Sequence, residues 1–278
     1  MSAVRKVAVV TGANKGIGKA VIEGLLEKTS NTIIYLTARD TTRGNATLHE
    51  LLPVAELTSN TLKFAQLDVT CDASTKAFYE SLKSDHANVD IIINNAGVFE
   101  GELEQVSNLD EAKFTLGVNY YGVKRVLETL KPLLHSGSRV VNVASTLGVM
   151  KGGYVTYPED RIKQLSTAQN VSDVDRFVEE YLELVAAGKA VEEGFPKNAY
   201  SVSKSAVIAY SVVQARELEV KGVYVNAMCP GYVATDMTKH AGHRTPAQGA
   251  DTAVFLATDP DVQFNGVFVF DREQKAWY

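Results

Sequence analysis

The sequence predicts an α/β protein built on a doubly wound parallel sheet, and three observations support this. Short β-branched runs alternate with longer segments whose apolar residues recur at helical spacing. The first run, residues 6–11, is apolar along nearly its whole length, as expected for a strand buried on both faces. A glycine-rich turn joins this run to the first helical segment. Repeated strand–helix–strand units form parallel sheets with helices on both faces, and ligands bind outside the carboxyl ends of the strands.

The later elements are predicted by the same two patterns, β-branched runs for strands and apolar residues at helical spacing for helices. The segment 16–28 carries one apolar stripe at helical spacing. The segment 109–133 ends near Pro132, and the segment 246–258 begins with Pro246 after Thr245, a good N-cap. We expect strands over residues 6–11, 32–37, 62–67, 89–94, 139–144, 223–228 and 266–270. We expect helices over residues 16–28, 43–56, 74–83, 109–133, 200–220 and 246–258.

Composition indicates an ordinary globular protein. Of the 278 residues, 45% are hydrophobic and 22% charged, which excludes a disordered or fibrous chain. We find no short repeat, low-complexity tract or linker that would divide residues 1–278, so we expect a single domain. The formal net charge of −5 gives no overall attraction to nucleic acid or an anionic membrane. Any anion must therefore be bound by local chemistry.

The spacing of the two cysteines and the length of the apolar runs indicate the cellular compartment of the protein. Cys71 and Cys229 lie far apart without CxxC spacing, which argues against a disulfide framework or a cysteine metal site and suits a reducing compartment. The apolar runs fall short of the roughly 20 residues of a membrane helix. Residues 1–6 lead directly into a strand and leave no room for the apolar core of a secretory signal. We expect a soluble, cytoplasmic protein.

The turn after the first strand has the chemistry of a dinucleotide site. Its glycines are spaced G-x-x-x-G-x-G, which differs from the usual G-x-G-x-x-G fingerprint but serves the same physical roles. Gly12 permits a tight turn, Gly16 lets backbone N–H groups approach a pyrophosphate, and Gly18 lets the helix pack on the strand. The helix N-terminus supplies partial positive charge. We expect the cofactor to contact Gly12, Asn14, Lys15, Gly16, Ile17 and Gly18; the alternative is a glycine-rich turn that binds nothing.

The residues at the end of the second strand indicate whether the cofactor is NADH or NADPH. An acidic residue that reads the ribose of NAD is expected about 20 residues after the glycine loop. Arg39 stands there first, and Lys15 adds a second cation within the loop. Two cations suit a 2′-phosphate, which arginine can bind with two parallel hydrogen bonds. The sequence therefore predicts NADPH, with Asp40 as the competing signal for NADH.

Several motifs in register carry a family resemblance. They are TGANKGIG at residues 11–18, NNAG at 94–97, a strand ending in Ser145, YSVSK at 200–204, and Pro230-Gly231. Together they resemble the short-chain dehydrogenase/reductases over essentially the whole chain. Within that family, TARD-x-x-RG at 37–44 and CPG-x-V-x-T-D-M at 229–237 look like the animal-type monomeric NADPH-dependent carbonyl reductases.

The resemblance implies a Rossmann-like fold and a cofactor groove. It places Asp68 and Val69 near the adenine, and Asn95, Ala96 and Gly97 along the ribose and nicotinamide. It also places Pro230, Gly231, Val233 and Thr235 against the nicotinamide carboxamide and nearby phosphate. Asn119 matches the family's asparagine on the helix after the NNAG segment, which implies that it orders a water returning protons to Lys204.

The pattern Tyr-x-x-x-Lys occurs three times, at Tyr79/Lys83, Tyr120/Lys124 and Tyr200/Lys204. Each pair shares a helix face because its members are four residues apart. We interpret the first pair as a surface tyrosine beside a solvated lysine, and the family's motif order excludes the second pair. The third pair follows the Ser145 strand and begins a helix rich in small residues, which can lie close to a cofactor. Tyr200, Lys204, Ser145 and Asn119 are therefore the expected catalytic residues.

Carbonyl reduction needs a hydride at carbon and a proton at the developing alkoxide. Lowering a tyrosine pKa from about 10 to about 7 corresponds to about 4 kcal/mol. One ammonium about 4 Å away at an effective dielectric of about 20 supplies that amount, and Lys204 is one turn from Tyr200. We also expect Lys204 to hold the nicotinamide ribose, and Ser145 to hydrogen-bond the substrate oxygen.

A long segment separates Ser145 from Tyr200, whereas such connections usually take about 2–6 residues. Residues 174–185 form an apolar stripe that predicts a helix capped by Ser172 or Asp173, and residues 159–165 predict a shorter one. We interpret residues 154–194 as a helical insertion. The resemblance implies that it covers the surface used elsewhere for oligomers, which predicts a monomer. The alternative is a substrate lid on a chain that still oligomerises.

These observations predict an NADPH-dependent carbonyl reductase acting on aldehydes, ketones and quinones. Its substrate pocket is expected to be lined by Ser145, Thr146, Leu147, Tyr232 and Met237. Two alternatives remain: a dedicated terpenoid, alkaloid or steroid ketone reductase, and a catalytically silent NADPH-binding scaffold. His240 and His243 have no neighbouring carboxylate or cysteine ligand except Asp236, so no metal is expected.

Overall fold

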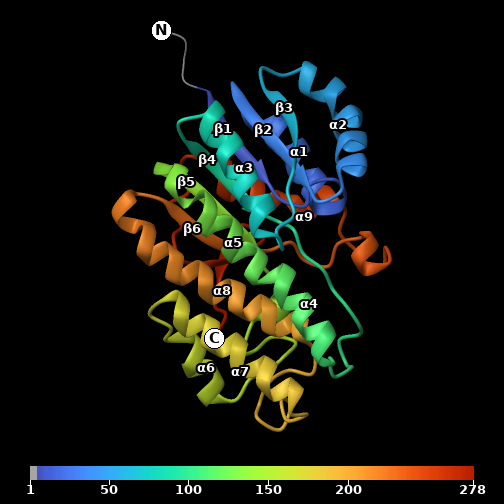
Figure 1. Cartoon of the computed structure of the whole chain (residues 1–278), viewed down its shortest axis with the longest axis vertical. Helices are drawn as coiled ribbons and strands as arrows, with labels where there is room; N and C mark the ends of the chain where they lie inside the picture. The colour runs from blue at the N-terminus through green and yellow to red at the C-terminus, as the bar shows by residue number, and fades with distance from the viewer. Residues whose placement is uncertain (1–4) are drawn as a thin grey trace.

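The protein is described here by a computed structural model that covers residues 5–278. One eight-stranded sheet runs through the molecule in the order β3-β2-β1-β4-β5-β6-β7-β8 (Figure 1). Its strands are β1 (Lys6–Val10), β2 (Thr32–Ala38), β3 (Thr61–Gln66), β4 (Val89–Asn94), β5 (Leu134–Val143), β6 (Tyr224–Cys229), β7 (Phe268–Phe270) and β8 (Glu273–Lys275). The pairings from β3 to β7 are parallel, and β8 is antiparallel to β7. The predicted doubly wound α/β fold is confirmed.

Helices cover both faces of this sheet. They are α1 (Gly16–Lys28), α2 (Thr41–Glu56), α3 (Asp72–Asp85), α4 (Leu109–Asn119), α5 (Tyr121–Leu130), α6 (Glu159–Ser166), α7 (Val171–Ala186), α8 (Ala199–Leu218) and α9 (Pro246–Thr258), with 3-10 turns η1 (Lys131–Leu133), η2 (Thr146–Gly148), η3 (Glu219–Lys221) and η4 (Asp236–Thr238). One core cluster packs α1, α2 and α9 on one face, and the other packs α3, α5 and α8 on the opposite face. Successive residues of β1 enter the two clusters alternately, which explains why this strand is apolar throughout.

Several predicted boundaries are wrong, each for a local reason. The expected helix over 109–133 bends at Tyr120 (φ −105°, ψ −62°), although helical hydrogen bonds continue through the bend, and its last residues form the 3-10 turn η1 at Pro132. Helix α2 starts earlier than expected because the Asp40 carboxylate caps it by accepting from Arg43 N. The cap of α7 is Asn170, which forms a reciprocal capping box with Asp173.

Strand β8 was not expected from the sequence. It pairs with β7 across a turn formed by Asp271 (φ 52°) and Arg272 (φ 63°), both in the left-handed region. Such a turn favours Asn-Gly or Asp-Gly, so the sequence Asp-Arg gives no hairpin signal.

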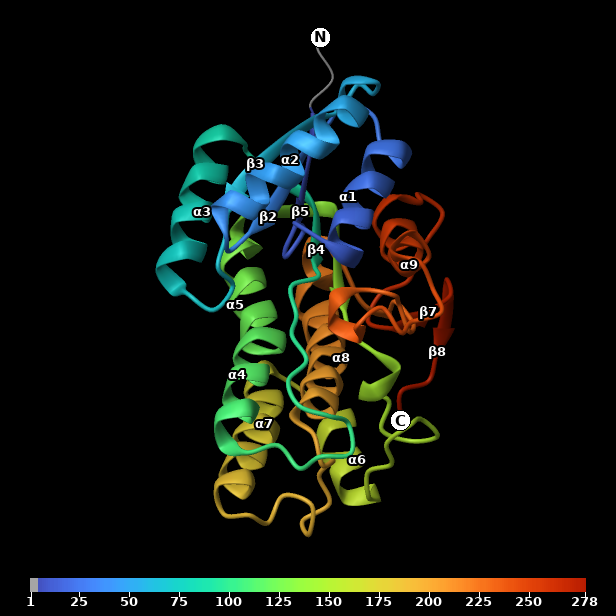
Figure 2. The ribbon, with the colours of Figure 1, turned by 90° about the vertical axis from the view of Figure 1, so that its right-hand side faces the viewer.

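The insertion packs on the outside of α4 and α8, where Figures 1 and 2 show α6 and α7 as an extra layer. The predicted apolar stripe of α7 is confirmed, because its central members Val174, Phe177, Val178 and Tyr181 are fully buried. Tyr157, just before α6, also forms a hydrogen bond of 3.0 Å with Ser205 on α8. The insertion is therefore an integral part of the core around α8.

Asp175 of α7 joins the insertion to α5. Its carboxylate accepts hydrogen bonds from the Tyr120 hydroxyl, at 2.8 Å, and from the Lys124 ammonium. Burial and the neighbouring carboxylate raise the pKa of Tyr120, so this buried phenol stays protonated. The second Tyr-x-x-x-Lys pattern thus has a structural role.

Among the helices within residues 5–278, none combines the length and apolar character needed to cross a membrane. The expectation about the start of the chain falls mostly on residues 1–4, which lie outside the described residues.

Replacing Asp175 with alanine should strongly destabilise the fold. The change leaves the buried Tyr120 hydroxyl without its acceptor and Lys124 without its counter-charge, so we expect the free energy of unfolding to fall by about 2–3 kcal/mol. Urea denaturation followed by circular dichroism measures this. Glu104→Ala is the matched control: it removes the exposed Lys197–Glu104 ion pair (2.9 Å, Glu104 89% exposed) and should cost under about 1 kcal/mol. Equal losses in the two variants would contradict the anchoring role.

Candidate active site

The predicted motifs meet at the carboxyl edge of the sheet. The glycine turn follows β1, residues 94–97 end β4, Ser145 follows β5, and residues 230–231 follow β6. Strand order reverses between β1 and β4, which is where doubly wound sheets bind ligands. Helix α8 brings Tyr200 and Lys204 to the same edge.

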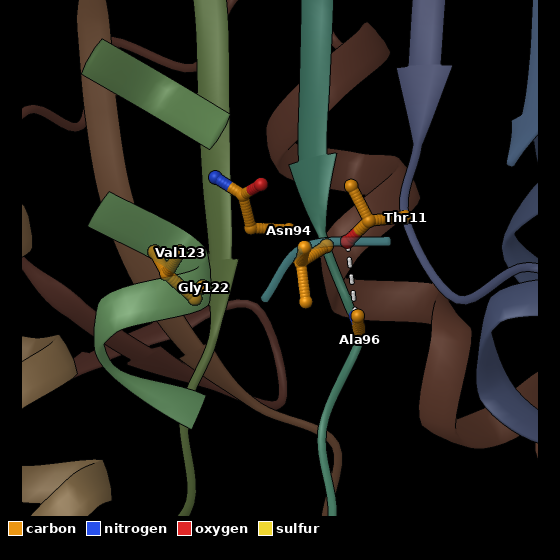
Figure 3. Close-up of a pocket in the computed structure, with 6 residues that line it drawn as sticks. Thr11, Asn94, Ala96, Gly122 and Val123 are labelled. Atoms are coloured by element: carbon orange, nitrogen blue, oxygen red, sulfur yellow. Dashed lines mark hydrogen bonds between the residues drawn. The ribbon is translucent and has the colours of Figure 1, made fainter. Parts of the chain in front are cut away.

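The glycine turn is tied to the segment after β4. Thr11 Oγ1 accepts from the backbone N–H groups of Asn95 and Ala96, each at 3.0 Å, and Figure 3 shows the bond to Ala96. The Asn95 amide donates to the carbonyls of Thr11 (3.0 Å) and Gly12 (3.1 Å). A Cβ at Gly18 would lie only 2.4 Å from Asn95 Nδ2, so this position has no space for a side chain.

The start of α1 fits an anionic cofactor. Gly12 and Gly16 have φ of +62° and +54°, which favour glycine. Lys15 provides no side-chain cap, and the first turn of α1 carries no acidic residue. The backbone N–H groups of this turn are therefore available to a phosphate.

The residues expected to select the cofactor lie at the same edge. Arg39 is exposed after β2, whereas Asp40 is engaged as the cap of α2. This engagement weakens the alternative interpretation of Asp40 as a ribose ligand. The Lys15 ammonium lies 2.7 Å from the Asp236 carboxylate, and this ion pair holds the pKa of Asp236 below its usual range. No sequence pattern signals this ion pair, because its partners lie 221 positions apart in the chain.

Asp68 and Val69 follow β3. The Asp68 carboxylate accepts from the backbone N–H (2.9 Å) and the hydroxyl (2.6 Å) of Thr70. Val69 is buried and faces Gly122, where a Cβ would approach it to 2.9 Å. A narrow gap with no room for a water molecule is lined there by Thr11, Val69, Asn94, Ala96, Gly122 and Val123 (Figure 3).

Lys204 is buried at the centre of the cluster. Only 4% exposed, it donates from Nζ to the Val143 carbonyl at 2.8 Å and lies 5.4 Å from the centre of the Tyr200 ring. A Cβ on Gly97 would lie 3.7 Å from this ammonium, so the segment after β4 passes close by. Burial lowers the pKa of Lys204 to about 8.

Tyr200 differs from the sequence-based expectation in its pKa. The Phe99 ring packs edge-on against its ring, with centroids 5.2 Å apart. Burial and the nearby Cys229 raise the pKa of Tyr200 above its usual value, and a hydrogen bond with Ser145 only partly opposes this. The predicted fall toward 7 is therefore wrong for this structure, because desolvation is the largest effect on this phenol and the Lys204 ammonium is bound to the Val143 carbonyl. Tyr200 is a protonated phenol at neutral pH.

Ser145 and Cys229 connect the ends of β5 and β6. Ser145 caps η2 by accepting from Leu147 N at 3.1 Å. The Cys229 sulfur accepts from Thr146 N (3.2 Å) and Gly231 N (3.3 Å). Cys229 thus links the ends of the two strands through its sulfur, a polar contact that no local sequence pattern signals.

Asn119 is fully buried, and its side chain makes three hydrogen bonds. Its amide donates to the Val98 carbonyl (2.9 Å) and the Ser203 hydroxyl (3.1 Å), and its oxygen accepts from Val98 N at 2.8 Å. Asn119 therefore holds the segment after Gly97 against α8. The water-ordering role stays a prediction.

A hollow of about 370 Å³ opens beside η2, within the size range of small-molecule sites. It is lined by Thr146, Val149, Gly152, Gly153 and Tyr154. Of the expected substrate residues, Thr146 lines it, and Ser145 and Leu147 flank Thr146 in the chain. Tyr232 and Met237 lie half-exposed between β6 and α9, outside this lining. The missed residues Val149, Gly152 and Gly153 lie just before the insertion, and exposed Tyr154 is its first residue; none of them belongs to a sequence motif.

The two histidines near η4 have separate surroundings. His240 Nε2 lies 3.2 Å from Asp236, and the His243 ring lies 6.0 Å from that of Tyr232. Across residues 5–278, the His, Cys, Asp and Glu side chains form no group of three or more that could hold a metal ion.

Comparison with known proteins identifies a matching family. The profile of the family described as short chain dehydrogenase matches residues 6–157 and 185–245. The unmatched stretch between them, 158–184, falls within the predicted insertion.

Individual relatives match along nearly their full length. The chain is 35% identical to Short-chain dehydrogenase/reductase 1 of Saponaria officinalis, covering 97% of this chain and 95% of that one. It is 33% identical to human Carbonyl reductase (NADPH) 1, with both chains fully covered. Among solved structures, salutaridine reductase from Papaver somniferum superposes with a TM-score of 0.84 at 30% identity, covering 96% of this chain and all of that one.

Burying the Lys204 charge should make stability depend on pH. Below about pH 8 Lys204 is charged in both states, and the full cost of burial opposes folding. Between about 8 and 10.5 the unfolded chain binds more protons, so stability rises with pH. From about pH 7 to about pH 10, we expect the unfolding free energy of the wild type to rise by about 2 kcal/mol relative to Lys204→Met.

Urea denaturation at several pH values measures this difference. Lys83→Met, at the exposed lysine of the first Tyr-x-x-x-Lys pair, is the control and should retain the wild-type dependence. Parallel pH curves for the wild type and Lys204→Met would contradict a buried charge at position 204.

Proposed function

The chain belongs to the short-chain dehydrogenase family, and we propose that it is an NADPH-dependent carbonyl reductase acting on aldehydes, ketones and quinones. The observation that carries this proposal is the grouping of a protonated tyrosine, a buried lysine and a serine beside the glycine turn. A family member that had lost catalysis would have no need to keep these groups together, which argues against a silent scaffold.

Tyr200 acts as the proton donor in this proposal. Bound NADPH supplies the hydride, and the carbonyl oxygen then develops negative charge. The raised pKa of Tyr200 keeps its phenol protonated, and the proton passes to the alkoxide, which is the stronger base. Ser145, already hydrogen-bonded to Tyr200, donates to the same substrate oxygen and stabilises its charge.

Lys204 stabilises the phenolate that remains after proton transfer. With a pKa of about 8, its side chain is mostly charged at neutral pH. Lys204 is only 4% exposed, so this ammonium acts on the phenolate with little screening. It also holds the nicotinamide ribose, while Asn119 orders the water that returns protons to Lys204.

The cofactor is NADPH, and the proposed contacts follow the carboxyl edge of the sheet. The pyrophosphate lies at the N-terminus of α1, and Arg39 and Lys15 bind the 2′-phosphate after Lys15 releases Asp236. The adenine lies near Asp68 and Val69. The nicotinamide half is contacted by Asn95, Ala96, Gly97, Pro230, Gly231, Val233 and Thr235.

We propose further that residues 1–278 form one domain that works as a cytoplasmic monomer. Helices α6 and α7 cover α4 and α8, the helical surface that the resemblance identifies with oligomer contacts elsewhere in the family. The two cysteines are unpaired, as a reducing compartment favours.

A second candidate is a reductase dedicated to one ketone. The specific observation in its favour is the similarity to salutaridine reductase, a protein named for a single substrate. A terpenoid, alkaloid or steroid ketone would occupy the hollow beside η2 in that case.

Tyr200→Phe should abolish carbonyl reduction while NADPH binding persists. Losing the proton donor should lower kcat by about 100-fold to 10,000-fold, because the phenyl ring fills the same space without an acid. The measurement is NADPH oxidation by absorbance with menadione, an aromatic aldehyde and a steroid ketone, together with NADPH binding by fluorescence.

Tyr79→Phe removes the hydroxyl of the first Tyr-x-x-x-Lys pair and should leave turnover unchanged. Wild-type turnover of all three substrates supports a broad carbonyl reductase, and turnover of the steroid ketone alone favours the dedicated enzyme. Substantial turnover by Tyr200→Phe would refute the role of Tyr200.

A further inference from the structure

The loop that follows β6, residues 230–235, is held by Arg244 through backbone hydrogen bonds. Arg244 N donates to the Tyr232 carbonyl at 3.1 Å, and the Arg244 carbonyl accepts from Ala234 N at 2.8 Å. These two bonds form an isolated parallel bridge between Val233 and Arg244. The loop therefore has a β-type partner although it lies outside the main sheet.

The Arg244 side chain lies directly over Gly231. A Cβ on Gly231 would be 2.7 Å from Arg244 Cδ and 2.8 Å from Nε, and Gly231 has φ of +79°. Only glycine allows the arginine stem to approach the loop backbone this closely. The guanidinium also packs 5.1 Å from the centre of the Phe270 ring.

Asp271 fixes this guanidinium. Both carboxylate oxygens accept from Arg244, each at 2.6 Å, in the parallel two-bond arrangement that orients an arginine most strictly. Asp271 stands at the turn between β7 and β8. The hairpin that the sequence did not predict thus reaches the loop after β6 through one ion pair.

We propose that the Arg244–Asp271 pair is a clamp that holds residues 230–235 ready for the nicotinamide end of the cofactor. The inference rests on the proposed function, which places Pro230, Gly231, Val233 and Thr235 beside that end. Arg244 and Asp271 are positioning residues in this arrangement. Ordering the loop before binding removes the cost of ordering it on binding, so the clamp raises affinity for the whole cofactor.

The same turn contains a matched control. Arg272, next to Asp271, forms a similar two-bond ion pair with Asp251 on α9. This pair fastens the hairpin to α9, and neither partner contacts residues 230–235 in the hydrogen bonds and ion pairs of the described residues. Asp251→Asn therefore weakens the hairpin's attachment without releasing Arg244.

The test compares two ligands by fluorescence titration and calorimetry: NADPH, and 2′-phospho-ADP-ribose, which lacks the nicotinamide. Asp271→Asn should weaken NADPH binding roughly fivefold, a modest loss because both partners are partly exposed. Binding of 2′-phospho-ADP-ribose should stay unchanged. Asp251→Asn should change neither, and Asp271→Glu, which keeps the carboxylate, should restore most of the NADPH affinity.

Thermal melts of the cofactor-free variants show whether each is folded, and Arg244→Lys provides a second way to break the two-bond contact if Asp271→Asn is unstable. If Asp271→Asn weakened the binding of both ligands equally, the clamp would be overturned. The same holds if Asp251→Asn lowered the NADPH affinity as much as Asp271→Asn does. Unchanged NADPH binding by Asp271→Asn would overturn it as well and leave the proposed function standing. A wild-type protein that binds neither ligand would instead overturn the proposed function together with the clamp.

Discussion

The close approach of α8 to η2 is the constraint on which the site depends. Gly148 has no space for a side chain, because a Cβ there would lie 2.5 Å from the Lys204 carbonyl carbon. The buried residues in this part of α8 include five small ones, Ser201, Ser203, Ser205, Ala206 and Ala209. This contact holds Ser145 beside Tyr200 and buries the Lys204 ammonium against Val143. Any larger side chain at the contact would separate the three groups.

This arrangement buries the Lys204 ammonium away from water, and the surrounding layers of the fold hold it there. The sheet packs on one side of α8, and the insertion packs on the other through the α7 stripe and the Tyr157–Ser205 hydrogen bond. Asp175 fastens the same insertion to α5. Sites of this kind exchange stability for function, since a neutral residue would be accommodated more easily at position 204.

Much of the fold, and which residues gather at the candidate site, could be predicted from sequence, because both depend on local patterns in a fixed order. Strand runs, the glycine turn and Tyr200–Lys204 are local, and parallel β–α units bring strand ends to one edge. The β8 hairpin, Lys15–Asp236 and Arg244–Asp271 could not be predicted, because they join residues without a spacing rule. The pKa of Tyr200 was predicted in the wrong direction because desolvation depends on the whole surrounding packing.

A crystal structure of the NADPH complex tests the proposed site most directly. The nicotinamide ring should lie between the loop 230–235 and the Tyr200 hydroxyl, with the ribose against Lys204 and the 2′-phosphate against Arg39. Its reactive face should open toward Ser145 and the hollow beside η2. A nicotinamide bound away from Tyr200 and Ser145, or a 2′-phosphate without contact to Arg39 or Lys15, would contradict it.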